Sequence, residues 1–135
     1  MRLNNLPKGV LIFGLIEILI GFVTLSTITY TLILGLNTKP INVLVFVYVT
    51  SFFSLILGIG LLKLNKLAHE LLLYFAGVII LSKILVIIEI IHLNGALETN
   101  VDPNIKNAIS ILYHLSLWCY LNKKGIKSLF AKNVK

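Results

Sequence analysis

The stretch that decides the fold is VLIFGLIEILIGFVTLSTITYTLILGL, residues 10–36, in which Glu17 is the one charged side chain. A helix that crosses a membrane needs roughly 20 mostly apolar residues, each adding about 1.5 Å. The stretch exceeds that length, so we expect a first spanning helix that tilts or projects beyond the hydrocarbon core. No small-residue cleavage site closes it, which favours a retained span over a signal peptide.

Three further apolar runs follow after short polar breaks. They cover residues 41–62, 67–93 and 104–121. The breaks contain residues that begin helices, because Asp102 followed by Pro103 suits an N-cap and a first helical residue. Asn65 is the one good turn residue between the second and third runs. The sequence therefore predicts an all-α fold, a single domain over residues 1–135 built as a bundle of four transmembrane helices with short loops.

The composition also points to lipid as the solvent. Of the 135 residues, 58% are hydrophobic and 13% are charged, and the mean hydropathy is +0.98. Soluble domains carry about 25% charged residues, and a small soluble fold leaves too much of its surface wet to hide this much apolar area. The single cysteine, Cys119, excludes an internal disulfide and a four-cysteine zinc site.

Basic residues set the expected topology. The formal net charge is +7, and the lysines and arginines lie in short tracts beside the apolar runs. One side of a four-span arrangement would carry most of them: Arg2, Lys8, Lys63, Lys66, Lys123, Lys124, Lys127, Lys132 and Lys135. The other side would carry only Lys39 and Lys106. The positive-inside rule then places both termini in the cytoplasm of a multi-pass protein of a prokaryotic plasma (inner) membrane, with membrane lipids rather than nucleic acid as the partner of the positive charge.

The basic segment 122–135 has two interpretations. Its apolar residues Ile126, Leu129, Phe130 and Val134 fall near one helical face, with lysines between them. That pattern is typical of a helix lying on the membrane surface. The alternative is a frayed basic tail that only enforces the topology, because so short a stretch is not stably helical alone.

Glu17 is the first candidate site residue. A charged carboxylate inside lipid costs several kcal/mol unless it is paired, neutralised or hydrated. Gly14, Glu17 and Gly21 share one helical face, and two glycines beside an acid form a groove that admits another helix closely. Glu17 is either a structural acid held by a neighbouring helix or a proton-carrying or cation-binding carboxylate.

Lys83 and His114 are the other two intramembrane candidates. Lys83, in the third run, is costly in lipid without a partner, and Glu17 is its natural one. His114 lies near the middle of the fourth run, with Ser110 on the same face. It is either a buried neutral histidine that shares a hydrogen bond with a neighbour or a proton relay or quinone contact.

Glu89 and His92 are expected at the outer interface, where two residues three apart on a helix can touch. His92 and His114 lie on different predicted helices and could together bind a metal ion or haem, although their depths in the membrane differ. We expect no catalytic residue, no metal and no cofactor, because no nucleophile, ligand cluster or phosphate-binding loop stands in the sequence.

The second apolar run has its own face of small residues. Ser51, Ser54 and Gly58 are spaced i, i+3 and i+7, and Ser54 and Gly58 form a small-xxx-small pair. Small residues let helix backbones approach closely in membranes. We therefore expect this face, like that of Gly14 and Gly21, to pack against another helix, in the same chain, in a second copy or in another membrane subunit.

Two resemblances bear on the fold. LPKGVLIFG, residues 6–14, and LGIGLL, residues 57–62, resemble small four-helix membrane proteins of bacteria and archaea that open with a Pro-x-Gly-Val pattern, a group for which no activity is known. In size and topology the chain is also similar to small multidrug exporters, in which a membrane carboxylate of the first helix is essential. Glu17 matches that carboxylate, whereas Lys83 and the position of Trp118 depart from the exporter pattern.

The sequence thus predicts a non-enzymatic small integral membrane protein. It would act as a structural or accessory subunit that packs with itself or with a larger membrane complex. The alternative is a small proton-coupled transporter or channel in which Glu17 carries the proton.

Overall fold

The computed structural model describes residues 6–36, 40–91 and 102–132. Within these ranges the chain forms five α-helices and no strand, as the predicted all-α class requires. The helices are α1 (Lys8–Ile33), α2 (Ile41–Leu62), α3 (Lys66–Ile87), α4 (Pro103–Leu121) and α5 (Lys124–Lys132).

Three of the described helices, α1, α2 and α3, are long and apolar enough to cross a membrane. The prediction of four such helices is therefore wrong for α4. That helix carries polar side chains along its first three turns, including Lys106, Asn107 and Ser110, which lower its mean hydropathy. Of these three residues Asn107 is buried and Lys106 and Ser110 are half-buried, so part of this polar surface packs against protein.

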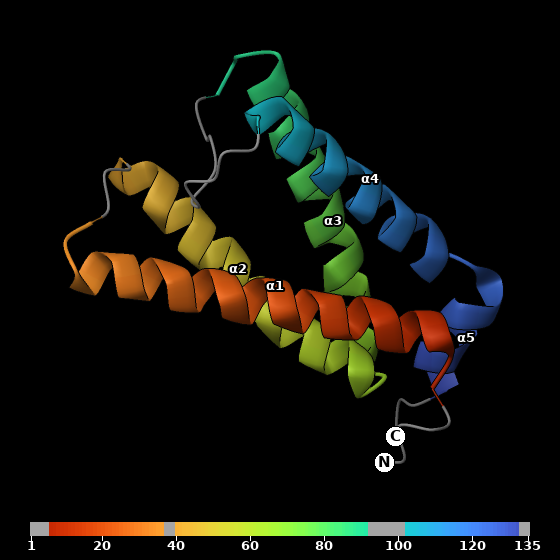
Figure 1. The fold of residues 1–135 in the computed structure, drawn as a ribbon. Helices are drawn as coiled ribbons and strands as arrows, with labels where there is room; N and C mark the ends of the chain where they lie inside the picture. Colours follow the sequence, from red (N-terminus) through yellow and green to blue (C-terminus); the bar gives the residue numbers. More distant parts are fainter. Residues whose placement is uncertain (1–5, 37–39, 92–101, 133–135) are drawn as a thin grey trace.

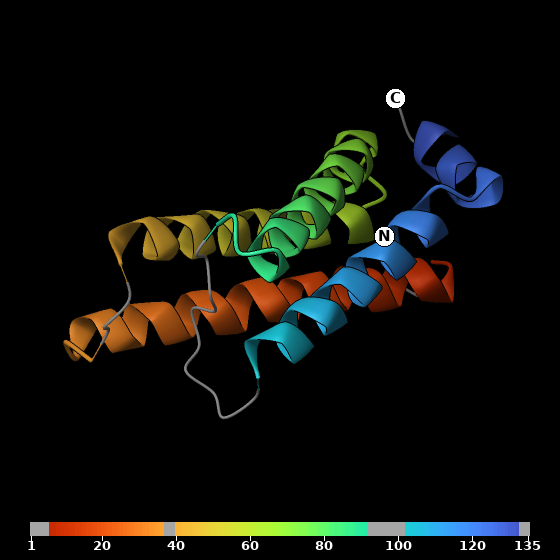
Figure 2. The same ribbon diagram turned by 90° about the horizontal axis from the view of Figure 1, so that it is seen from above.

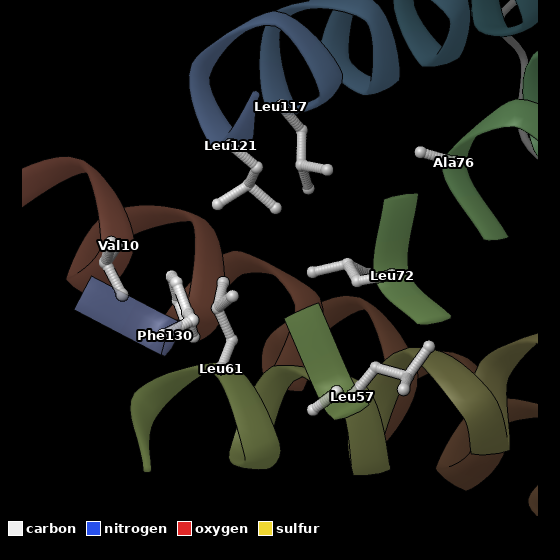
Figure 3. Packing of buried hydrophobic residues seen from close by; sticks show 9 residues of the cluster. Val10, Leu57, Leu61, Leu72, Ala76, Leu117, Leu121 and Phe130 are labelled. Atoms are coloured by element: carbon white, nitrogen blue, oxygen red, sulfur yellow. The ribbon is translucent and has the colours of Figure 1, made fainter. Parts of the chain in front are cut away.

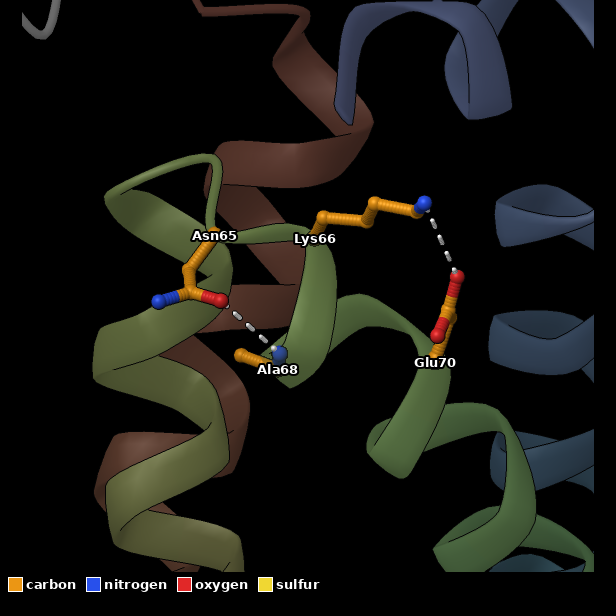
Figure 4. A network of polar contacts seen from close by, with 4 residues as sticks. All are labelled: Asn65, Lys66, Ala68 and Glu70. Carbon is orange, nitrogen blue, oxygen red and sulfur yellow. Dashed lines mark hydrogen bonds and ion pairs between the residues drawn. The ribbon is translucent and has the colours of Figure 1, made fainter. Parts of the chain in front are cut away.

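Capping residues explain where the helices begin. The side chain of Asp102 accepts a hydrogen bond from the backbone N–H of Asn104 at 2.7 Å, and Pro103 is the first residue of α4, which confirms the predicted N-cap. Asn65 caps α3 in the same way, because its side chain accepts from the N–H of Ala68 at 3.2 Å (Figure 4). One turn later Lys66 and Glu70 form an exposed ion pair at 3.9 Å.

Left-handed residues explain where the chain turns. Gly35 has φ 64° just after α1. Leu64 has φ 52° in the connection between α2 and α3, and Glu89 has φ 60° just beyond α3. A non-glycine residue in this region is uncommon and marks a tight change of direction. α3 therefore ends at Ile87, six residues before the end of the predicted apolar run at Leu93, and Glu89 lies exposed outside the helix.

The helices form two antiparallel hairpins. Figures 1 and 2 show α1 beside α2 in the first hairpin and α3 beside α4 in the second, with α5 near the start of α1. The two hairpins meet near the start of α1 and the end of α4, and they separate toward their other ends. The tight connection from Leu62 to Lys66 fixes α2 and α3 at the closed end of this V.

Glycines bring the two helices of the first hairpin into close contact. A Cβ atom at Gly58 would lie 2.9 Å from the Cβ of Glu17 and 2.9 Å from the carbonyl oxygen of Gly14. A Cβ atom at Gly21 would lie 2.6 Å from the carbonyl oxygen of Ser51. Real Cβ atoms do not approach backbone oxygens this closely, so these positions require glycine. The two small-residue faces identified in the sequence therefore pack against each other within the chain.

The core lies at the closed end of the V, and α5 completes it. Figure 3 shows Phe130 of α5 beside Val10 and Leu61, and Phe130 is only 1% exposed. Its ring also stacks on His69 of α3, with 4.4 Å between ring centroids. His69 in turn donates a hydrogen bond from Nε2 to the carbonyl oxygen of Leu121 at 3.1 Å. The segment after α4 is thus a helix docked on the bundle through an aromatic side chain.

The glycine contact gives a testable prediction about stability. We expect Gly58→Ala to lower the free energy of unfolding by about 1–2 kcal/mol, because the overpacking cost of about 1–3 kcal/mol exceeds the gain of up to about 1 kcal/mol from alanine's helix propensity. Gly77→Ala is the matched control, since a Cβ there meets no atom within 4 Å. Unfolding in mixed detergent and SDS micelles, followed by circular dichroism, measures both. Equal effects of the two substitutions would contradict this account of the α1–α2 contact.

Candidate intramembrane polar site

Glu17 lies halfway along α1, at the point where α1, α2 and α4 meet. It is 1% exposed, and the buried residues of α1 that share its face include Gly14 and Gly21. The glycine contact described above brings α2 close enough for its own small side chains to reach the acid. The sequence thus places a carboxylate in an environment that neither water nor lipid reaches.

Two hydroxyl groups hold the Glu17 side chain. Tyr113 of α4 donates a hydrogen bond from Oη to Oε1 at 2.9 Å. Ser54 of α2 contacts the carboxyl Oε2, and its Oγ also lies 3.0 Å from the backbone carbonyl oxygen of Glu17. Each carboxyl oxygen therefore has a partner from a different helix, which is the condition for burying such a group without a large penalty.

The contact with Tyr113 joins the two hairpins. Ser54 and Glu17 both belong to the first hairpin, whereas Tyr113 belongs to the second. The ring of Tyr113 also packs against Phe13 of α1, with ring centroids 6.0 Å apart. A polar bond and an aromatic contact therefore fix the same face of α4 against α1.

Lys83 is not the group that pairs with Glu17. No ion pair joins them among the described residues. α3 ends four residues after Lys83, at Ile87, so this lysine lies about one turn from the end of its helix. A lysine at that position extends its ammonium group toward the helix end more easily than one at the centre of a span.

His114 lies beside the Glu17 contact but does not touch the carboxyl group. It is 8% exposed, and its Nδ1 donates to the carbonyl oxygen of Ser110 at 2.7 Å, one turn earlier in α4. Its ring stands edge-on to that of Tyr113 at 5.0 Å between centroids. Lys83 makes no hydrogen bond or ion pair with Glu17 or His114 in the described part of the chain. The structure therefore places His114 beside Tyr113 and does not bond Glu17, Lys83 and His114 to one another.

Tyr113, Asn107 and His69 were missed as site residues by sequence reasoning. Tyr113 directly precedes His114, and counting which residues of α4 could face α1 would have singled it out. Asn107 is 4% exposed with a side-chain amide that has no hydrogen-bond partner. His69 has no sequence signal beyond its position in the first turn of α3.

The remaining predicted polar residues do not add to this site. Glu89 is exposed beyond the end of α3. His92 lies outside the described residues, and so do the predicted pairings of His92 with Glu89 and with His114. In the described part of the chain no group of three or more His, Cys, Asp or Glu residues is arranged to hold a metal ion. The arrangement can hold the two hairpins together.

The hydrogen bond between the hairpins can be measured with a double-mutant cycle. We expect Tyr113→Phe to destabilise the fold by about 1 kcal/mol and Glu17→Leu by more, because Glu17→Leu removes the acceptors of both hydroxyl groups, whereas Glu17→Gln would keep an acceptor oxygen for Tyr113. The coupling between Tyr113→Phe and Glu17→Leu should be about 0.6 kcal/mol, the average found for such bonds in membrane proteins, where the largest values reach about 1.7 kcal/mol. Tyr74→Phe serves as the control, since Tyr74 is 76% exposed. A coupling indistinguishable from zero would mean that Tyr113 and Glu17 do not bond in the folded protein.

Comparison with known proteins leaves the site to be interpreted from its own geometry. No family model matches the chain, and neither a curated protein nor a solved structure is significantly similar to it. The resemblances to small four-helix membrane proteins and to small multidrug exporters therefore remain expectations from the sequence.

Proposed function

We propose that this chain is a non-enzymatic accessory membrane protein that binds a transmembrane helix of a larger membrane partner. The contacts of the buried acid support this role, because Ser54 and Tyr113 engage Glu17 within the fold and leave it only 1% exposed. The small-residue faces of α1 and α2 pack against each other, so Gly14, Gly21 and Gly58 are not free to contact a partner. A partner would instead meet the apolar surface between α2 and α3.

The observation that carries the proposal is an open groove between α2 and α3. Its volume is about 730 Å³, and it lies where the two helices separate from their tight connection. Apolar side chains line both walls, chiefly Val45, Val49 and Phe53 of α2 and Leu71, Phe75 and Val78 of α3. The rings of Phe53 and Phe75 face each other with centroids 6.5 Å apart.

The chemistry of the groove favours a helix over a lipid molecule as its occupant. The hydroxyl of Thr50, one of the few polar groups along the lining, is already bonded to the carbonyl oxygens of Phe46 and Val47, at 2.9 and 3.1 Å. No basic side chain stands among the described residues of the lining, so these residues offer no positive charge to a lipid headgroup. The α2 wall of the groove, from Ile41 to Phe53, is about 18 Å long at about 1.5 Å per residue. This length matches a row of three to four side chains along one face of an apolar helix.

Photo-crosslinking from the groove tests this proposal. A photoreactive amino acid replaces Val49, which is 47% exposed inside the groove, or Leu19, which is 59% exposed on α1 and does not line it. In native membranes we expect one discrete protein adduct from position 49 and none from position 19. The groove-filling Val49→Trp variant should lose co-purification of the same protein while the fold stays intact by circular dichroism. Lipid adducts alone, or an adduct of two copies of this chain, would contradict the proposed occupant.

A second candidate function is proton-coupled transport, and the Glu17 contacts favour it specifically. The one hydroxyl hydrogen of Ser54 can serve only one of its two contacts with Glu17 at a time. A proton on the carboxyl group would supply the second hydrogen bond, and its loss would alter the contact that ties α1 to α2. Protonation of Glu17 would then be linked to the contacts between the helices.

Flux in proteoliposomes separates the second function from the first. If Glu17 carries protons, an imposed pH gradient should drive proton or dye movement, and Glu17→Gln should reduce the rate at least about tenfold, as expected for loss of a group that takes part in proton transfer. Glu70→Gln is the matched control, because Glu70 is an exposed carboxylate paired only with Lys66. Flux equal to that of empty vesicles, or flux unchanged by Glu17→Gln, would contradict proton-coupled transport through Glu17.

A further inference from the structure

Lysines from several segments of the chain come together at the closed end of the V. The core at that end contains Val10, Leu61, Ala68 and Leu121, and a lysine lies two residues from each of them in the sequence. The first turn of α5, which Figure 1 shows beside the start of α1, adds two more. We call this set the lysine surface, and its members are Lys8, Lys63, Lys66, Lys123, Lys124 and Lys127.

The charge of the lysine surface is almost unopposed within the fold. All of its side chains are exposed. Among the described residues Glu70 is the one carboxylate at this end, and it lies 3.9 Å from Lys66 (Figure 4). The other described acids are elsewhere, since Glu17 is buried between helices and Asp102 and Glu89 lie at the far ends of α4 and α3. The positive charge is therefore available to an anionic partner.

The lysine surface also lies where the apolar helix surfaces begin. α1 starts at Lys8, α2 ends one residue before Lys63 and α3 starts at Lys66, and these are the three helices apolar enough to cross a membrane. Apolar side chains are exposed one turn farther along, at Ile12 and Ile59. Lysines at the ends of spanning helices reach the bilayer interface. The nearest anions to these lysines are therefore lipid phosphates.

The docking of α5 determines which of its faces is left for the membrane. Phe130 is buried in the core and Ile126 is half-buried against it. The apolar face of α5 thus packs on protein, whereas Lys124 and Lys127 are exposed. A helix docked in this way meets a bilayer through its charges and not through inserted apolar side chains.

We propose that the lysine surface binds the headgroups of anionic phospholipids and so keeps these lipids at the closed end of the V. Charge complementarity supports this occupant, because each lysine near an anionic bilayer surface strengthens binding about fivefold. The proposal goes beyond the accessory role, because the groove between α2 and α3 is lined by other residues. It also requires that salt weakens the lipid preference, since charges at an exposed surface are screened.

The single tryptophan of the chain, Trp118, can report which lipids lie at this end. It is 45% exposed on α4, five residues before Lys123. Phospholipids brominated in the acyl chain quench tryptophan fluorescence on contact. The full chain is reconstituted into vesicles of mixed phosphatidylglycerol and phosphatidylcholine, with one or the other lipid brominated. Quenching then gives the binding constant of phosphatidylglycerol relative to phosphatidylcholine at Trp118.

In the wild type we expect phosphatidylglycerol to be favoured about fivefold at low salt, as one lysine contact would give. The preference should fall toward one in about 1 M sodium chloride, where the screening length is about 3 Å. A wild-type ratio near one at low salt would overturn the proposal and leave an acidic protein surface as the partner of these lysines.

Variants separate a charge effect from a change of fold. Lys123→Gln combined with Lys124→Gln should bring the ratio close to one, and the corresponding pair of glutamate substitutions should favour phosphatidylcholine, because reversed charge repels the headgroup. Lys106→Gln, at the opposite end of α4, is the matched control and should keep the wild-type ratio. Circular dichroism confirms that each variant folds. A preference that salt and both double substitutions leave unchanged would also overturn the proposal.

Discussion

The structure depends on the close approach of α1 and α2 around Glu17. Gly58 leaves room for the Cβ of Glu17, and the carbonyl oxygen of Gly14 occupies the space that a side chain at position 58 would need. At that separation Ser54 reaches the carboxyl group, and the remaining carboxyl oxygen is turned toward α4, where Tyr113 bonds to it. In a medium without water a buried acid requires such partners. The position of the second hairpin therefore follows from the packing of the first.

Much of the fold could be predicted because it depends on local signals. Apolar runs and capping residues involve positions that are close together in the sequence. They were therefore sufficient to predict α2 and the start of α4. The end of α3 could not be predicted in this way. The apolar run continues to Leu93, but the helix stops at Ile87, and the left-handed conformation of Glu89 has no marker in the sequence because glycine is the usual residue there.

The candidate site was harder to predict, because its contacts join residues that are far apart in the chain. The cost of an acid in lipid identified Glu17, and the shared face with glycines indicated that a helix would pack on it. The partner itself was not evident. An opposite charge is the obvious choice for a buried carboxylate, yet the structure uses Tyr113, 96 residues away, and leaves Lys83 one turn from a helix end. Electrostatic complementarity gives a list of partners, but the packing of α4 against α1 decides among them.

Docking of α5 on the bundle has a consequence for synthesis of the protein. Val10 and Phe130 belong to the same core cluster, but they are 120 residues apart in the sequence. At about 5–20 residues per second, translation delivers Phe130 roughly 6–24 s after Val10. During that interval Val10, Leu61 and His69 lack the aromatic ring that packs on them (Figure 3). This core is therefore completed only after α1 to α4 have been synthesised, and a nascent chain that stalls before residue 130 leaves an open apolar site at the closed end of the V.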